Sequence, residues 1–304
     1  MTNFILEKLG LSTNDRAFIL HADDIGLLQA TVPAYEGLLR NQRITAASFM
    51  VPCPWFPSAA KAVGEAAGLE QLDVGVHVTL TSEWNAMRWG PLSAAGRQTE
   101  SGLLDNEGYF FRTSAEVQGG AQVSAVEEEL KIQVERARLA GIDITHLDSH
   151  MGSIVHPRFL ATYVGQAMHM RVPAFLPRLS TEAMAAIGFD PDTIKQVLHY
   201  SDQIEAAGYP LFDSYSMLPL GKATGFEARL EIAKQTLNEA PAGLHYLIIH
   251  PAIDTPELRA TASDWEARAM DYTLFMSDEW AQAVGSSGVK LVSMRDLRKV
   301  IRGE

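Results

Sequence analysis

Asp23 and Asp24 are two adjacent carboxylates that follow the apolar run Ala17–Leu20 closely. The run predicts a buried strand, and paired carboxylates at its end repel each other and are costly to bury without a partner. A bound metal ion or a proton-transfer role is the usual reason to keep such a pair. The alternative interpretation is a polar turn in which one Asp caps the following helix.

Three further predicted strands also end in ionisable side chains. The third ends with His77, the fourth carries the sequence Thr-His-Leu-Asp-Ser-His at 145–150, and the seventh ends with His250. In a βα barrel the carboxyl ends of the strands open onto one face, where catalytic groups from several strands meet. Two imidazoles and a carboxylate suit a divalent ion, and nitrogen ligands favour zinc. Taken singly, each histidine could instead be a hydrogen-bonded core residue.

A repeated strand–helix pattern must position these side chains. Eight strands are predicted, at Ala17–Ala22, Thr45–Val51, Asp73–Thr79, Ile144–Asp148, Pro173–Pro177, Leu211–Ser214, Leu244–His250 and Val289–Val292. The clearer predicted helices are Leu28–Arg40, Val123–Ala140, Glu227–Glu239, Ser263–Val284 and Met294–Ile301. Strands that alternate with helices imply an α/β fold with a parallel sheet. At this length we expect a distorted TIM-like (β/α) barrel, with an open doubly wound sheet as the alternative.

The segment 82–120, after the third predicted strand, interrupts this alternation. It holds Trp84, Trp89 and the run Tyr109-Phe110-Phe111 among Gly, Pro, Asn and Ser. We interpret it as an insertion or lid-like loop over the barrel mouth, within a single catalytic barrel domain of residues 1–304. Its aromatic side chains either pack the loop onto the barrel or stack on a sugar ring.

Composition narrows the classes of partner. The 304 residues carry a formal net charge of −12, which disfavours nucleic acid and anionic membrane surfaces as partners. There is one cysteine, Cys53, so no internal disulfide is expected, and this fits a reducing cytoplasm. The first residues lack the basic-then-apolar layout of a signal peptide. No apolar stretch approaches the ~20 residues that a membrane span needs. We therefore expect a cytoplasmic protein with a small-molecule substrate.

The order and spacing of these motifs resemble the YdjC-like carbohydrate deacetylase family. The matching segments are Ala-Asp-Asp-Ile-Gly at 22–26, Arg-Ile-Thr-Ala-Ala-Ser at 43–48, Gly-Val-His-Val-Thr-Leu-Thr at 75–81 and Thr-His-Leu-Asp-Ser-His at 145–150. The resemblance covers the first half of the chain well and the C-terminal half loosely. It implies a distorted βα barrel and removal of N-acetyl groups from amino sugars.

The resemblance also implies roles for individual residues. By position, Asp24, His77 and His150 match the family's metal ligands, and Asp23 matches its catalytic base. His250 occupies a place from which a histidine could serve as the acid. We accordingly expect one divalent metal ion, zinc or magnesium, with a metal-bound water as the nucleophile, and an acetylated saccharide as substrate.

Three other side chains are candidates for orienting the ligands or contacting substrate. Asp148 and His146 are expected to orient ligand side chains, although His146 could be a structural histidine. Arg178 could neutralise Asp23, contact substrate, or form only a surface salt bridge. The sequence departs from the family at two positions, because Gly152 replaces a common histidine and His21 replaces a common asparagine.

Two alternative functions stay open at this point. One is a metallohydrolase that cleaves a non-sugar amide or ester, and the other is a catalytically silent family member that binds a saccharide. Gly152 keeps the second alternative open, and the full set of acid, base and ligand residues argues against it. The sequence leaves a homodimer open as well.

Overall fold

The computed structural model describes residues 4–65, 73–186, 188–221 and 225–304. Its strands are β1 (Arg16–Ile25), β2 (Ala46–Phe49), β3 (Val74–Val78), β4 (Ile144–Ser149), β5 (Ser214–Met217), β6 (Gly243–Ile249) and β7 (Lys290–Leu291). Its α-helices are α1 (Phe4–Lys8), α2 (Thr31–Arg40), α3 (Phe56–Glu65), α4 (Ser114–Gly120), α5 (Val123–Leu139), α6 (Pro157–Met170), α7 (Thr181–Ala186), α8 (Pro191–Ala206), α9 (Phe226–Glu239), α10 (Pro256–Thr261), α11 (Trp265–Met276), α12 (Asp278–Ser287) and α13 (Met294–Arg302). Two short 3-10 helices are η1 (Thr99–Ser101) and η2 (His150–Gly152).

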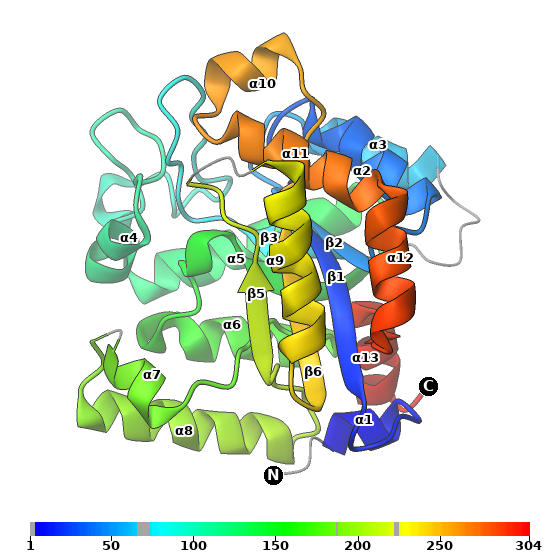
Figure 1. The fold of residues 1–304 in the computed structure, drawn as a ribbon. Coiled ribbons are helices and arrows are strands. Elements are labelled where there is room, and N and C mark those ends of the chain that lie inside the picture. Colours follow the sequence, from blue (N-terminus) through cyan, green and yellow to red (C-terminus); the bar gives the residue numbers. More distant parts are fainter. Residues whose placement is uncertain (1–3, 66–72, 187, 222–224) are drawn as a thin grey trace.

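The sheet forms a distorted TIM-like barrel surrounded by helices (Figure 1). Its strand order is β4-β3-β2-β1-β6-β5, every pairing is parallel, and β7 pairs with the first half of β1. Parallel bridges from Leu147 to Ala174 and from Pro177 to Phe212 join β4 to the chain that leads into β5. The extended segment 173–178 therefore spans the gap between the two edges of the sheet.

Several predicted elements differ in detail. The predicted strand Pro173–Pro177 is an extended segment with single bridges rather than a full strand, since prolines at both ends cannot donate ladder hydrogen bonds. The strand predicted at Leu211–Ser214 begins only at Ser214. The single helix predicted over Ser263–Val284 is two helices, α11 and α12, because Ser277 ends one and caps the other, accepting a hydrogen bond from the Trp280 N–H.

Successive residues of β1 point to opposite faces, and the two faces enter different cores. Phe18 and Leu20 pack in the large core between the sheet and the helices. Ala17 and Ile19 pack in a smaller core inside the barrel. Helices α1 and α13, which lie together at the end of the barrel where the strands begin (Figure 1), contribute side chains to this inner core. The barrel is thus closed by apolar side chains at one end, and polar chemistry is left to the other.

The segment 82–120 is folded onto the carboxyl ends of the strands. Trp84 and Trp89 are buried, and the Trp89 indole N–H donates to the Thr81 carbonyl at 2.7 Å. Arg88 pairs with Asp105 at 2.6 Å, which ties the two halves of the segment together. The two tryptophans therefore pack the loop onto the barrel, which was one of the two interpretations of its aromatic residues.

Among the residues that the structure describes, no helix is both long enough and apolar enough to cross a membrane.

Candidate active site

A break in the regular pairing of β1 brings its two adjacent carboxylates to one place. The register between β1 and β2 shifts between Ala22 and Ile25, and Asp24 adopts a positive φ of 63°. In a regular strand, neighbours would point to opposite faces, but both carboxylates lie near the His77 ring. A non-glycine residue in this conformation stores backbone strain of about 1–3 kcal/mol, and such strain clusters at functional sites. Gly26 follows in the turn with a φ of 88°. The position suits glycine, because a Cβ there would lie 3.1 Å from the Phe56 backbone.

Asp24, His77 and His150 converge from three separate elements. The Asp24 Oδ1 atom lies 3.3 Å from His77 Nε2 and 3.1 Å from His150 Nδ1. All three side chains are buried, and one ligand atom from each lies within 4.8 Å of the others. The structure therefore assembles the three residues that the sequence predicts as metal ligands.

In each histidine of this set, the ring nitrogen that does not face Asp24 contacts another carboxylate. His77 presents Nε2 to Asp24, while its Nδ1 lies 2.8 Å from Asp148 Oδ1 and 3.0 Å from Ser48 Oγ. His150 presents the opposite nitrogen, Nδ1, and its Nε2 lies 3.1 Å from Glu83 Oε2. Carboxylates in this position fix the orientation and tautomer of ligand histidines.

Arg268 is the cation that offsets the charge of Asp24. Its guanidinium donates to Asp24 Oδ2 at 2.8 Å and to Asp264 at 3.0 Å, and it lies 5.2 Å from the centre of the Trp84 ring. Burial alone would raise the pKa of Asp24, but Arg268 and the nearby histidine His150 outweigh it and hold that pKa well below its usual range. Asp24 is therefore ionised, as a metal ligand must be.

The surrounding carboxylates act on the histidines in the opposite sense. Burial would lower the pKa of His150, but the charges of Glu83 and Asp24 raise it to about 9. Burial would also lower the pKa of His77, but the charges of Asp148 and Asp23 outweigh this effect and raise that pKa well above its usual value. The cluster thus attracts positive charge strongly.

Asp23 lies beside the ligand set and contacts a further histidine, His21. Its Oδ1 atom is 2.5 Å from His21 Nδ1, and its Oδ2 atom is 3.9 Å from His77 Nε2. The other nitrogen of His21 lies 2.9 Å from His146 Nε2. His146 is thus linked to Asp23 through His21, and both histidine side chains lie inside the barrel.

His250 stands at the end of β6, where two buried side chains fix its backbone. The His250 N–H donates to Asp271 Oδ2 at 2.9 Å, and Asp271 forms a buried ion pair with Arg229. The imidazole Nδ1 is buried and has no hydrogen-bond partner among the described residues. Burial lowers the pKa of His250, and Asp24, which raises it, does not overcome this effect.

Arg178 does not join this cluster. Its guanidinium pairs with Glu205 at 2.5 Å and with Asp213 at 3.2 Å, and about a third of the side chain is exposed. The surface salt bridge, which was one of three interpretations, is therefore what the structure contains. Gly152 lies in the turn after β4 with a φ of 65° and open space around its Cβ position.

Sequence reasoning missed Glu83, Arg268, Asp271 and Arg229. Arg268 and Asp271 lie one turn apart on α11, and Glu83 follows the Thr-Leu-Thr end of the third motif, so proximity to that motif was the one available signal. The others reach the site only through the tertiary fold. Their spacing along the chain shows no relation to the histidine motifs.

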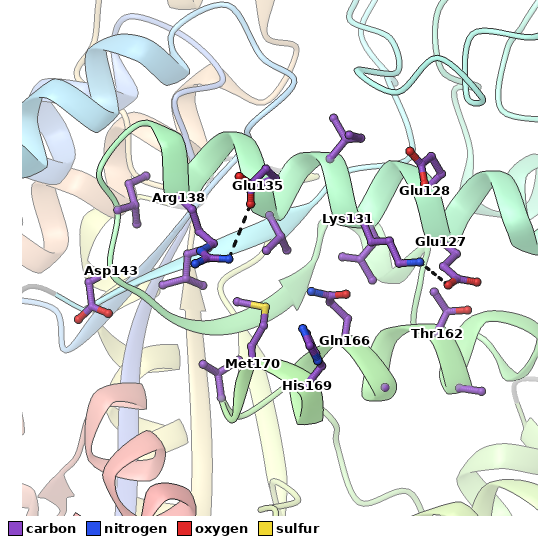
Figure 2. Close-up of a pocket in the computed structure, with 18 of the residues that line it drawn as sticks. Glu127, Glu128, Lys131, Glu135, Arg138, Asp143, Thr162, Gln166, His169 and Met170 are labelled. Atoms are coloured by element: carbon purple, nitrogen blue, oxygen red, sulfur yellow. Dashed lines mark hydrogen bonds and ion pairs between the residues drawn. The ribbon is translucent and has the colours of Figure 1, made fainter.

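A separate groove lies on the outside of the barrel, between α5 and α6 (Figure 2). It encloses about 1090 Å³, and none of the residues predicted for the site lines it. Charged side chains on its wall pair along α5, Lys131 with Glu127 at 2.6 Å and Arg138 with Glu135 at 3.7 Å. The titratable cluster inside the barrel is therefore the better candidate for chemistry.

Comparison with known proteins gives consistent matches over most of the chain. A family model described as YdjC-like protein matches residues 17–286. A carbohydrate deacetylase of Thermus thermophilus is 34% identical over 268 residues, which cover 88% of this chain and 89% of that protein. A carbohydrate deacetylase of Listeria monocytogenes is 25% identical over 292 residues, which cover 92% of this chain and 99% of that protein. A crystal structure of a protein from Enterococcus faecalis, described as a cellobiose-phosphate cleavage protein, shares the fold with a TM-score of 0.71 at 20% identity. The match covers 93% of this chain and 99% of that one.

Proposed function

The chain belongs to the YdjC-like protein family, and from this premise we propose that it is a metal-dependent carbohydrate deacetylase. It removes the N-acetyl group from an amino sugar or oligosaccharide. The observation that carries the proposal is the convergence of Asp24, His77 and His150 around one point, with Asp23 beside them. The names of the curated relatives support the sugar and the acetyl group as substrate chemistry.

The donor set of Asp24, His77 and His150 fits one divalent ion. It consists of two imidazoles and one carboxylate, all buried, with the rear nitrogen of each imidazole engaged by Asp148 or Glu83. This composition favours zinc and also admits magnesium or another divalent ion. When bound, the ion supplies Lewis acidity toward the acetyl carbonyl and lowers the pKa of a water molecule.

Asp23 is suited to act as the general base. It lies within the ligand cluster without belonging to the Asp24, His77 and His150 set, and its Oδ1 accepts a hydrogen bond from His21. Its Oδ2 lies 3.9 Å from His77 Nε2, and from this position it can accept the proton of the attacking water. Proton transfer of this kind contributes a rate factor of about 10²–10⁴.

His250 is suited to act as the general acid. An amine leaves poorly as an anion, so the reaction needs a proton donor at the leaving nitrogen. The Nδ1 of His250, which has no hydrogen-bond partner in the part of the chain that the structure describes, lies at a strand end on the same face of the barrel as Asp23 and Asp24. The lowered pKa of His250 makes its protonated form a stronger acid and reduces the fraction that is protonated near neutral pH.

We further propose that residues 1–304 work as one catalytic barrel. The first strand, β1, carries both carboxylates and pairs with β6 and β7 from the C-terminal third. The base and the acid accordingly sit on paired strands.

The test is release of free amine from acetylated amino sugars of one to four units. The protein is stripped of metal with a chelator, assayed, reloaded with zinc or magnesium, and assayed again, with the exposed His169→Asn as the matched control. We expect amine release in the reloaded wild type and in His169→Asn, and none in the stripped protein. Equal release from stripped and reloaded protein would contradict metal dependence. Hydrolysis of non-sugar amides without any sugar turnover would overturn the substrate class.

A further inference from the structure

Three side chains below the proposed ligand set face one another inside the barrel. His21 Nε2 lies 2.9 Å from His146 Nε2 and 3.7 Å from Asp148 Oδ2. The three residues come from β1 and β4 and are at most 2% exposed. None of them belongs to the Asp24, His77 and His150 set, so they require an account of their own.

The outer nitrogens of the two histidines are already committed as donors. His21 Nδ1 lies 2.5 Å from the Asp23 carboxylate, which accepts a hydrogen bond. The Thr145 hydroxyl has one proton, which it donates to the carboxylate of Asp73. The Thr145 oxygen, 2.8 Å from His146 Nδ1, then accepts from that nitrogen. With both outer nitrogens donating, the two Nε2 atoms face each other at 2.9 Å, so a cation, either a shared proton or a metal ion, must lie between their lone pairs.

Asp148 distinguishes a metal ion from a shared proton. Its Oδ1 atom is engaged by His77, but its Oδ2 atom is buried and has no hydrogen-bond partner among the described residues. A proton shared by the two histidines would leave this oxygen unsatisfied, and an unsatisfied polar atom in a buried position is destabilising. A metal ion that binds all three atoms satisfies the oxygen and both lone pairs together.

The backbone opposite the pair leaves space for this arrangement. A Cβ on Gly75 would lie 2.4 Å from His146 Nε2, so only glycine accommodates the ring in its present position. The distances of 2.9 and 3.7 Å from His21 Nε2 to the other two ligand atoms also suit a common ion, since two ligand atoms each about 2.0–2.2 Å from zinc lie no more than about 4.4 Å apart.

We propose that His21, His146 and Asp148 form a second divalent-cation site, and that it takes an ion which prefers imidazole ligands, such as zinc. The ion fixes His21, which contacts the proposed base Asp23, and Asp148, which holds His77. The site shares no ligand with the first set, so each can be removed separately.

The test is the number of zinc ions bound per chain, measured by elemental analysis after chelation, reloading and removal of free zinc. The variants are His21→Asn, which introduces the residue common in the family, and His146→Asn, with His169→Asn as the control and circular dichroism as the check on folding. We expect two ions in the wild type and in His169→Asn, and one in each of the other two variants. Anomalous diffraction from zinc-loaded crystals should place the lost ion among His21, His146 and Asp148.

A zinc count that is the same in the wild type, in His21→Asn and in His146→Asn overturns the second site. His150→Ala separates this failure from failure of the first site, because it should lose one ion and keep the ion bound by His21 and His146. A wild type that binds one ion, lost in His146→Asn and kept in His150→Ala, would support the second site and contradict the first.

Discussion

The two halves of the barrel interior are built from the same strands and have opposite chemistry. On the inward face of β1, Ala17 and Ile19 lie in the apolar inner core, whereas His21 and Asp23, further along the same face, lie in the polar cluster. On strand β4, His146 and Asp148 both reach the cluster, and His150, in the 3-10 helix η2 that follows, reaches it as well. The position of a residue along the strand, rather than the face it occupies, decides whether it serves stability or chemistry.

The polar half of the interior, near the carboxyl ends of the strands, is called the upper half, and the apolar half is called the lower half. Burying charged side chains in the upper half costs free energy, and nearby partners offset this cost. Buried charges are costly unless they are paired and hydrogen-bonded. Here Arg268 pairs with Asp24, and Arg229 pairs with Asp271 below the His250 backbone. The lower half, near the amino ends of the strands, is closed mainly by apolar side chains of α1 and α13, and its buried Asp73 accepts hydrogen bonds from Thr145 and from the Arg295 N–H. Substitutions in the upper half should therefore affect function, and those in the lower half should affect stability.

The largest effect is expected for Asp23→Asn. The change removes the proposed base and keeps the size of the side chain, so kcat should fall about 10²–10⁴-fold while zinc remains bound through Asp24, His77 and His150. Amine release and zinc content measured on the same sample test this. Near-wild-type turnover would show that another group accepts the proton.

The second effect belongs to the lower half. Ile19 is fully buried in the inner core, and Ile19→Ala should lower the free energy of unfolding by about 2–5 kcal/mol because it leaves a cavity. Urea unfolding of the metal-free protein measures this, with the exposed Leu139→Ala as the control. KM and kcat of the folded variant should stay close to wild type. A loss of zinc affinity would show that the halves are coupled.

The third effect is a pH dependence of metal binding in the upper half. The pKa of His150 is raised to about 9 by Glu83 and Asp24, against burial, and a metal must displace the proton that this pKa retains. Zinc affinity should therefore rise with pH, more steeply than the roughly tenfold per unit that one proton gives, because the raised pKa of His77 means that a second proton must also be displaced before the affinity reaches its plateau. In the metal-free protein, the stabilisation that protonated His150 gives is complete below the unfolded pKa of about 6.5 and is lost as pH rises through 9.

Glu83→Gln sharpens this prediction. It removes the charge that contributes most to raising the pKa of His150, so the plateau should move to lower pH, and zinc affinity at the plateau should fall about 10–100-fold. Zinc titrations from pH 6 to 10 measure both, with the exposed Glu100→Gln as the control. A plateau at an unchanged pH would show that Glu83 does not act on His150.

The smallest effect is expected outside both halves. Arg178→Gln breaks a partly exposed ion pair with Glu205 and Asp213, which should cost at most about 1 kcal/mol. Kinetics should not change. A drop in kcat would place Arg178 at the substrate after all.

The sequence predicted the barrel and the meeting of these ionisable side chains because the signals for them are local, whereas the family resemblance implied which of them are ligands. Asp23 and Asp24 follow an apolar run, and His77 and His150 end short strand patterns, so the strand ends of a barrel had to bring them together. What escaped prediction depends on contacts between distant segments. Arg268 lies 244 positions from Asp24, and the positive φ of Asp24 leaves no trace in residue type. Arg178 follows the extended segment that was predicted as the fifth strand, and its partners, Glu205 and Asp213, could not be foreseen.

The most direct measurement is the zinc content, by elemental analysis, of tag-free wild type beside His150→Ala, both stripped and reloaded under identical conditions. We expect His150→Ala to hold one ion fewer than the wild type and to release no amine from acetylated amino sugars, while His169→Asn matches the wild type in both. Equal zinc content in the wild type and His150→Ala would contradict the claim that Asp24, His77 and His150 hold the catalytic ion.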